Sequence, residues 1–188
     1  MELRPAYPIV TARLRLRPLT TSDIGALLTY RSDPEVCRYL PFAPMTEEVL
    51  QTRLGGDLGR RELIAEGDGL TLGAERLSDG RLIGDVVLFY RSEEHAGGEI
   101  GYVFHPDVAG QGFAAEACTP VLDMAFGDMG LHRVVANMDA RNDASARLAE
   151  RLGMRREAHF VSNEIFKGEW SDLVVYAILA DEWRAKRT

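Results

Sequence analysis

The sequence has few cysteines and no long apolar segment. Cys37 and Cys118 lie far apart, with no histidine or cysteine cluster beside them, so neither a disulfide framework nor a zinc site is indicated. No segment approaches the roughly 18 consecutive apolar residues of a membrane span. The first ten residues carry charges and prolines instead of the apolar stretch of a signal peptide. These absences predict a reduced, cytoplasmic protein with no metal and no membrane partner.

Basic charge is also scarce, because 29 acidic residues against 22 basic ones give a net charge of -7. Nucleic-acid affinity depends mainly on basic groups that neutralise phosphates, so a nucleic-acid partner is not expected. Arg13, Arg15 and Arg17 alternate with apolar residues, which indicates the wet face of a strand. An acidic surface suits a cationic substrate such as an amine, but it selects no function by itself.

The chain is predicted to form one domain over residues 1–188. Its 188 residues are 46% hydrophobic and 27% charged, which is ordinary for a globular domain of this size. No Ser/Gly-rich run, charge block or internal repeat marks a linker between two smaller units. The glycines near residues 55–56 and 67–69 are therefore interpreted as loops inside that one domain.

Apolar–polar alternation predicts strands, and apolar residues three or four positions apart predict helices. The expected strands cover residues 13–17, 70–75, 82–90, 99–104, 132–138, 156–163 and 173–179. One expected helix follows the caps at 20–22 and stops at Asp33-Pro34, and the others cover 46–64 (interrupted at Gly55-Gly56), 114–127 and 143–152. Hairpins mixed with strand–helix–strand units predict an α/β fold, a mixed sheet with helices on both faces.

The most informative segment runs from Val103 to Ala117, where an expected strand leads through a loop into an expected helix. Gly110 and Gly112 allow a phosphate to approach the backbone, and the helix N-terminus supplies unpaired N–H groups. The segment lacks the third glycine of the dinucleotide fingerprint and the Gly-Lys-Ser/Thr end of a Walker loop. A plain connecting loop remains the alternative interpretation.

The run Gly110-Gln111-Gly112-Phe113-Ala114 resembles the pyrophosphate-binding loop of the GNAT superfamily of N-acetyltransferases. The family pattern is Arg/Gln-x-x-Gly-x-Gly/Ala, and Ala109 stands at its first position. Other segments resemble the RimJ/RimL-like branch, in order and over nearly the whole chain. They are Leu14–Pro18, Leu82–Gly84, Glu99–Tyr102, Asn142-x-x-Ser145 with Leu152-Gly153-Met154, and Gly168, Asp172, Tyr176 and Glu182-Trp183 as a C-terminal hairpin.

The resemblance implies a mostly antiparallel, twisted sheet of about seven strands, flanked by about four helices. Its central parallel strands, here residues 99–104 and 132–138, are expected to splay apart and admit coenzyme A. The pantetheine arm would pair with backbone groups of Val103 and Phe104, as an added strand does. The residues expected to hold the rest are Gly110, Gln111, Gly112, Phe113 and Ala114 for the diphosphate, and Asn142 for the pantetheine.

The resemblance further implies transfer of an acetyl group from acetyl-CoA to a primary amine by direct attack in a ternary complex, without a metal. Ser145 matches the serine proposed to sit beside the coenzyme sulfur, where it would donate a hydrogen bond. Two glutamates are candidates for the base: Glu164 aligns with the one proposed in RimL, and Glu99 lies where other branches place theirs. Solvent is a third way to remove the proton.

Several questions stay open at this point. The acceptor is either a protein N-terminus or a small molecule. The sequence does not decide between them, because the loops at residues 39–49 and 160–170 carry no readable motif. The same scaffold could use another acyl donor such as succinyl-CoA, or act as a non-catalytic acyl-CoA-binding or sensing module. A nucleotide-binding protein of unrelated fold is the third alternative. A homodimer through the C-terminal hairpin is an open expectation from the family.

Overall fold

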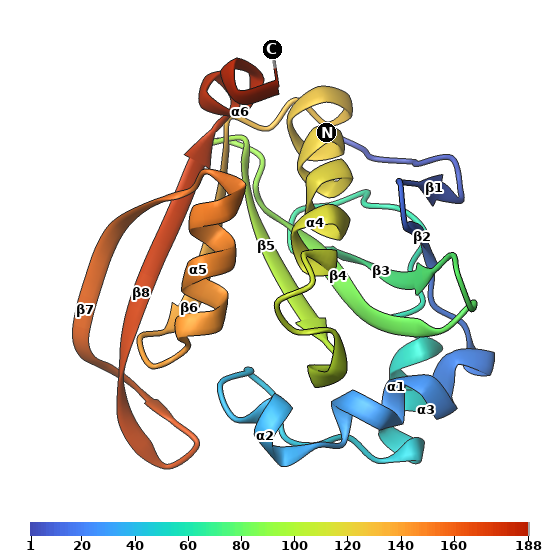
Figure 1. The fold of residues 1–188 in the computed structure, drawn as a ribbon. Coiled ribbons are helices and arrows are strands. Elements are labelled where there is room, and N and C mark those ends of the chain that lie inside the picture. Colours follow the sequence, from blue (N-terminus) through green and yellow to red (C-terminus); the bar gives the residue numbers. More distant parts are fainter. Residues whose placement is uncertain (188) are drawn as a thin grey trace.

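The structure, a computed structural model, describes residues 1–187, and its central feature is one mixed sheet of eight strands (Figure 1). The spatial order of the strands is β1-β2-β3-β4-β5-β6-β8-β7. Among these strands, β5 and β6 form the one parallel pair. The strands are β1 (Ile9–Val10), β2 (Leu14–Pro18), β3 (Gly69–Arg76), β4 (Leu82–Ser92), β5 (Gly97–Phe104), β6 (Arg133–Asp139), β7 (Arg155–Phe166) and β8 (Glu169–Leu179).

Helices cover both faces of this sheet. The α-helices are α1 (Ile24–Arg31), α2 (Pro34–Cys37), α3 (Glu47–Leu54), α4 (Phe113–Asp123), α5 (Asp143–Leu152) and α6 (Ala180–Arg187). Helix α4 packs on β2, β4 and β5, α5 packs on β6 and β7, and α1 packs on β4 from the other side. Every helix within residues 1–187 is too short or too polar to cross a membrane.

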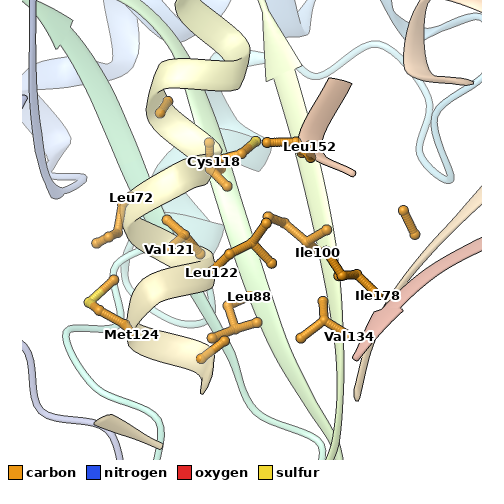
Figure 2. Close-up of a cluster of buried hydrophobic side chains, with 14 of the residues drawn as sticks. Leu72, Leu88, Ile100, Cys118, Val121, Leu122, Met124, Val134, Leu152 and Ile178 are labelled. Carbon is orange, nitrogen blue, oxygen red and sulfur yellow. The ribbon is translucent and has the colours of Figure 1, made fainter. Parts of the chain in front are cut away.

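The core consists of two clusters, one on each face. The larger cluster joins the strands to α4, and Figure 2 shows Leu72, Leu88 and Ile100 of the sheet against Val121 and Leu122 of that helix. The smaller cluster joins α1 and α3 to Val103 of β5. Since Ile100 and Val103 are an odd number of positions apart on one strand, their side chains point to opposite faces.

The parallel strands pair over only three positions. Gly97 faces Arg133, Gly98 faces Val134 and Glu99 faces Val135, after which no further pairing joins β5 to β6. The rest of β5 stays paired with β4 as far as Phe104. The expected mixed, mostly antiparallel sheet with a splayed central parallel pair is therefore confirmed.

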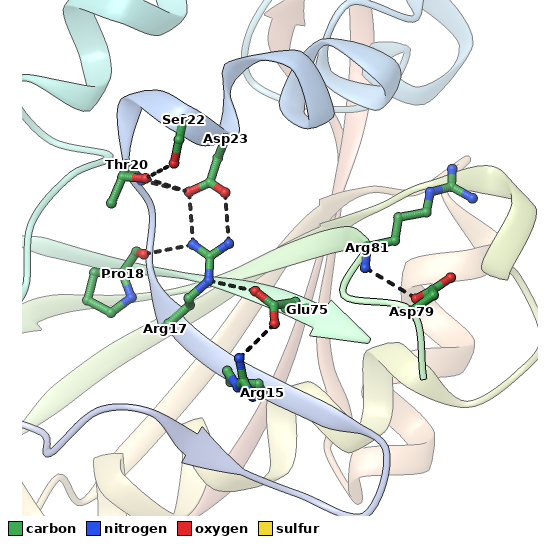
Figure 3. A network of polar contacts seen from close by, with 9 residues as sticks. All are labelled: Arg15, Arg17, Pro18, Thr20, Ser22, Asp23, Glu75, Asp79 and Arg81. Carbon is green, nitrogen blue, oxygen red and sulfur yellow. Dashed lines mark hydrogen bonds and ion pairs between the residues drawn. The ribbon is translucent and has the colours of Figure 1, made fainter. Parts of the chain in front are cut away.

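The arginines of β2 form ion pairs instead of a basic patch. Arg17 binds both carboxylate oxygens of Asp23, at 2.9 and 2.8 Å, and also binds Glu75, as does Arg15 (Figure 3). The leucines that alternate with them, Leu14 and Leu16, are fully buried. The alternation expected for this strand is confirmed, and the carboxylates neutralise its polar side.

Three sequence expectations about the elements were wrong or incomplete. The helix expected over residues 46–64 ends at Leu54, because glycines at 55 and 56 weaken the helix and Leu63 is drawn into the core, where it pairs with Leu3. Glu182 and Trp183 lie in α6, not in the C-terminal hairpin. The short elements β1 and α2 were missed because two- and four-residue segments carry no readable periodicity.

Candidate active site

The predicted phosphate loop connects β5 to α4 and exposes the N-terminus of that helix. Gly110 and Gly112 have φ angles of 75° and 82°, in the left-handed region that glycine adopts without strain. Gly112 is the residue before the first turn of α4, and no side chain caps that turn. The first N–H groups of α4 therefore have no acceptor within the helix, which suits them to bind a phosphate.

A groove of about 660 Å³ lies between this loop and α5. Gln111 is the one predicted coenzyme residue that does not line it. The Gln111 side chain instead donates to the carbonyl of Asp107 at 2.9 Å, which stabilises the loop. The other predicted coenzyme residues all line the groove: Val103, Phe104, Gly110, Gly112, Phe113, Ala114, Asn142 and Ser145.

The register of β5 determines which backbone groups face the gap beside β6. The N–H of His105 donates to the carbonyl of Ile83 at 2.9 Å, so His105 points toward β4. Backbone groups alternate sides along a strand, so those of Val103 also point toward β4 and those of Phe104 and Tyr102 point into the gap. Phe104 thus offers its backbone to a ligand in the groove, whereas Val103 contributes its side chain.

Helix α5 begins beside this gap with two polar side chains. Asn142 caps the helix, since its Oδ1 accepts from the N–H of Ser145 at 3.1 Å. The hydroxyl of Tyr102 donates to the carbonyl of Ser145 at 3.0 Å, and burial raises the pKa of Tyr102. In residues 1–187 no partner occupies the Ser145 hydroxyl or the Asn142 amide nitrogen, so both are available to a ligand.

A second cavity, of about 410 Å³, adjoins the groove. It extends between β4, β5, β6 and the segments near α2 and α3. Six residues line both spaces: Tyr39, Leu40, Tyr102, Val103, Asn142 and Ser145. The groove and the cavity therefore meet at the start of α5, where a ligand in one could contact a ligand in the other.

A buried ion pair lies at the wall of the second cavity. Asp85 of β4 accepts from Arg31 at 2.6 Å and from the hydroxyl of Tyr30 at 2.7 Å. The side chains of Arg31 and Asp85 are 4% and 1% exposed. The pair was missed in the sequence, where the one signal was an aspartate within the apolar run of β4.

The two glutamates considered as bases lie in different places. Glu99 lines the second cavity and pairs with Arg91 at 2.8 Å. Glu164 is exposed on β7 opposite Ser171, and it lines neither space. The structure thus brings Glu99 and Ser145 into one connected cavity and leaves Glu164 outside it.

Other histidine, cysteine and tryptophan side chains cap a turn, pack in the core or lie exposed. His105 caps the turn after β5 by accepting from the N–H of Asp107. Cys118 is fully buried in the core, and burial raises the pKa of its thiol, so it does not act as a nucleophile. Trp183 is buried, and Trp170 is 65% exposed. Across residues 1–187 no group of three or more metal-ligating side chains is suited to hold a metal.

Comparison with known proteins agrees with this geometry. Residues 13–155 match the acetyltransferase (GNAT) domain family. The uncharacterized N-acetyltransferase YnaD of Bacillus subtilis is 35% identical over 175 residues, covering 93% of this chain and 98% of YnaD. A crystal structure of a GNAT-family acetyltransferase from Bacillus anthracis superposes with a TM-score of 0.82 at 32% identity, covering 93% of this chain and 99% of that one.

Two more distant relatives have names that state an acceptor. The ribosomal protein uS5-alanine N-acetyltransferase of Escherichia coli is 28% identical over 47% of this chain and 45% of its own length. The spermidine N(1)-acetyltransferase of Vibrio cholerae is 23% identical over 93% of this chain and 97% of its own length. The relatives therefore include proteins named for a protein acceptor and for a polyamine.

Proposed function

Because the chain belongs to the acetyltransferase (GNAT) family and is an N-acetyltransferase, we propose that it moves the acetyl group of acetyl-CoA to the α-amino group of a peptide or protein. The observation that carries this proposal is the junction of the two spaces. The groove ends at Ser145 and Tyr102, where the cavity that contains Glu99 begins. Donor and acceptor could thus bind from opposite sides and meet.

The groove fits coenzyme A in the chemistry of its walls. Gly110 and Gly112 leave room above the free N–H groups of α4, which suit a diphosphate. The open edge of β5 at Phe104 suits the amides of a pantetheine arm, and so does the free amide nitrogen of Asn142. When bound, the coenzyme supplies a thioester whose carbonyl carbon is open to attack by an amine.

The reaction requires an unprotonated amine, and an α-ammonium with a pKa near 8 is mostly protonated at pH 7. Glu99 is the proposed proton acceptor. It lies three residues before Tyr102 on β5, about 10 Å along the strand, so it would act through water in the cavity. The N–H of Phe104 would stabilise the developing oxyanion, and the Ser145 hydroxyl would donate to the leaving sulfur.

The charges of the cavity favour an α-amine over a polyamine. Three arginines line the cavity, namely Arg31, Arg53 and Arg60, together with three carboxylates. Each carboxylate already pairs with an arginine: Asp85 with Arg31, Asp57 with Arg53, and Glu99 with Arg91. No unpaired carboxylate among these lining residues remains for the further ammonium groups of a polyamine.

The proposal also covers the domain organisation and the location of the protein in the cell. One working domain over residues 1–188 is supported by the sheet that joins β2 to β7. A cytoplasmic location is supported by two buried cysteines that form no disulfide.

Thiol release from acetyl-CoA tests the function directly. The amine panel would hold peptides with varied N-terminal residues, free amino acids, spermidine and aminoglycosides, and succinyl-CoA would replace acetyl-CoA in a parallel series. Turnover with peptides and acetyl-CoA is expected, with spermidine much slower. Fast turnover of spermidine would contradict the acceptor class, and binding of coenzyme A without turnover of any amine would favour a sensing module.

Matched glutamate variants test the base. Glu99→Gln should lower kcat by at least about 100-fold at pH 7, and the loss should shrink at higher pH because solution then deprotonates the amine. Glu164→Gln is the control, since it removes the same charge outside the cavity. If Glu164→Gln loses activity and Glu99→Gln does not, Glu164 is the base. If neither variant changes kcat, solvent takes the proton.

A further inference from the structure

Two arginines of α5, Arg147 and Arg151, face the groove without a counterion. Both line the groove and both are exposed. Within residues 1–187, no carboxylate lies at ion-pair distance from either guanidinium. The third arginine that lines the groove, Arg141, is instead bound to Asp139 at 2.7 Å. Positive charge without a partner is therefore concentrated on one wall of the groove.

The spacing of Arg147 and Arg151 places two like charges side by side on α5. Residues four apart are neighbours on a helix, and like charges there destabilise it. Asp143 lies one turn before Arg147 and also lines the groove, yet it is not within ion-pair distance. Ala149 and Leu152 are buried, so the packing of α5 holds its arginine side toward the groove. An anion in the groove would remove the repulsion.

Arg151 reaches across the groove to the phosphate loop. Its Nη1 lies 4.0 Å from the position that a Cβ on Gly112 would occupy. Gly112 directly precedes the free N–H groups of α4. A guanidinium and a helix N-terminus thus face the same space, and both are strong phosphate-binding groups.

The loop itself lacks a long polar side chain at its first position. Ala109 stands where the loop pattern has Arg or Gln, and it lines the groove with a methyl group. We propose that Arg147 and Arg151 replace that side chain from α5 and bind the coenzyme diphosphate opposite Gly112. This inference rests on the proposed function, because it presupposes that the groove holds coenzyme A.

Calorimetric titration of the full chain with coenzyme A tests the inference without turnover. Arg151→Ala should weaken binding by about tenfold and Arg147→Ala by a smaller factor, as expected for charge-assisted contacts to phosphate. Arg156→Ala is the matched control, because Arg156 also lacks a carboxylate partner but lies outside the groove. Its affinity for coenzyme A should equal that of the unchanged chain.

Two further titrations locate the contact. With 3′-dephospho-coenzyme A, Arg151→Ala should show the same loss, whereas a loss that vanishes would overturn the assignment to the diphosphate. Adding Ala109→Arg to Arg151→Ala should restore affinity, and failure to do so would count against the replacement. Unaltered affinity in both single variants overturns the inference while leaving the proposed function intact. If the unchanged chain does not bind coenzyme A, both fail.

Discussion

Replacing Asp85 by asparagine should destabilise the protein strongly. The substitution would keep the shape of the side chain but remove the charge that compensates Arg31, which is only 4% exposed. One carboxylate oxygen accepts from Arg31 Nη2 at 2.6 Å, and the other accepts from Arg31 Nε at 3.1 Å and from Tyr30 at 2.7 Å. An amide NH₂ in either place therefore faces an N–H donor of Arg31. Removing one partner of a buried ion pair costs about 3–5 kcal/mol.

Thermal and denaturant unfolding would measure this loss. A chain of this length loses about 2–4 °C of melting temperature per kcal/mol, so Asp85→Asn should melt roughly 6–20 °C lower. The control is Asp181→Asn, which breaks an ion pair of a carboxylate that is 94% exposed and should cost no more than about 1 kcal/mol. Adding Arg31→Met should recover part of the loss, because no buried charge then remains. If the two variants lose free energies of unfolding that agree within about 1 kcal/mol, the reasoning is refuted. Asp85 would then not compensate the charge of Arg31.

Two other predictions concern contacts around the site. Lys167, in the β7–β8 turn, donates to the carbonyls of Cys37 and Phe42 (the latter at 3.0 Å), which fixes the segment carrying Tyr39 and Phe42 of the cavity. Lys167→Met should therefore raise the KM for the acceptor by about tenfold and change the Kd for the coenzyme much less. An equal change in both constants would contradict this prediction. The control is Lys186→Met, which breaks another lysine–carbonyl hydrogen bond. Burial opposes ionisation of Glu116, but hydrogen bonds from Thr11 and Arg13 outweigh it and lower its pKa below 4.5. Ionised Glu116 therefore stabilises the protein above pH 4.5, and this stability is lost as the pH falls through the folded-state pKa. On acidification, the melting temperature of Glu116→Gln should fall less than that of the unchanged chain. Parallel curves of melting temperature against pH would contradict the prediction.

The groove proposed for the coenzyme was predictable because its parts are contiguous in the sequence. Gly110 and Gly112 stand next to the helix start that they expose, and Asn142 stands three residues before the N–H that it caps. The cavity proposed for the acceptor was not predictable. Its residues come from separate segments, such as Arg31 of α1, Asp85 of β4 and Phe42 after α2, and none of these segments has a motif.

The sequence determined the elements whose signals are local. Alternation in β2, the cap and Gly153 stop of α5, and the glycine loop before α4 all depend on neighbours within a few residues. Tertiary structure alone decided the position at which β5 and β6 part, that Asp85 meets Arg31, and that Lys167 holds the segment beside the cavity. The last two contacts join residues 54 and 130 positions apart. Such partners are selected by the simultaneous packing of many elements, which no local pattern encodes.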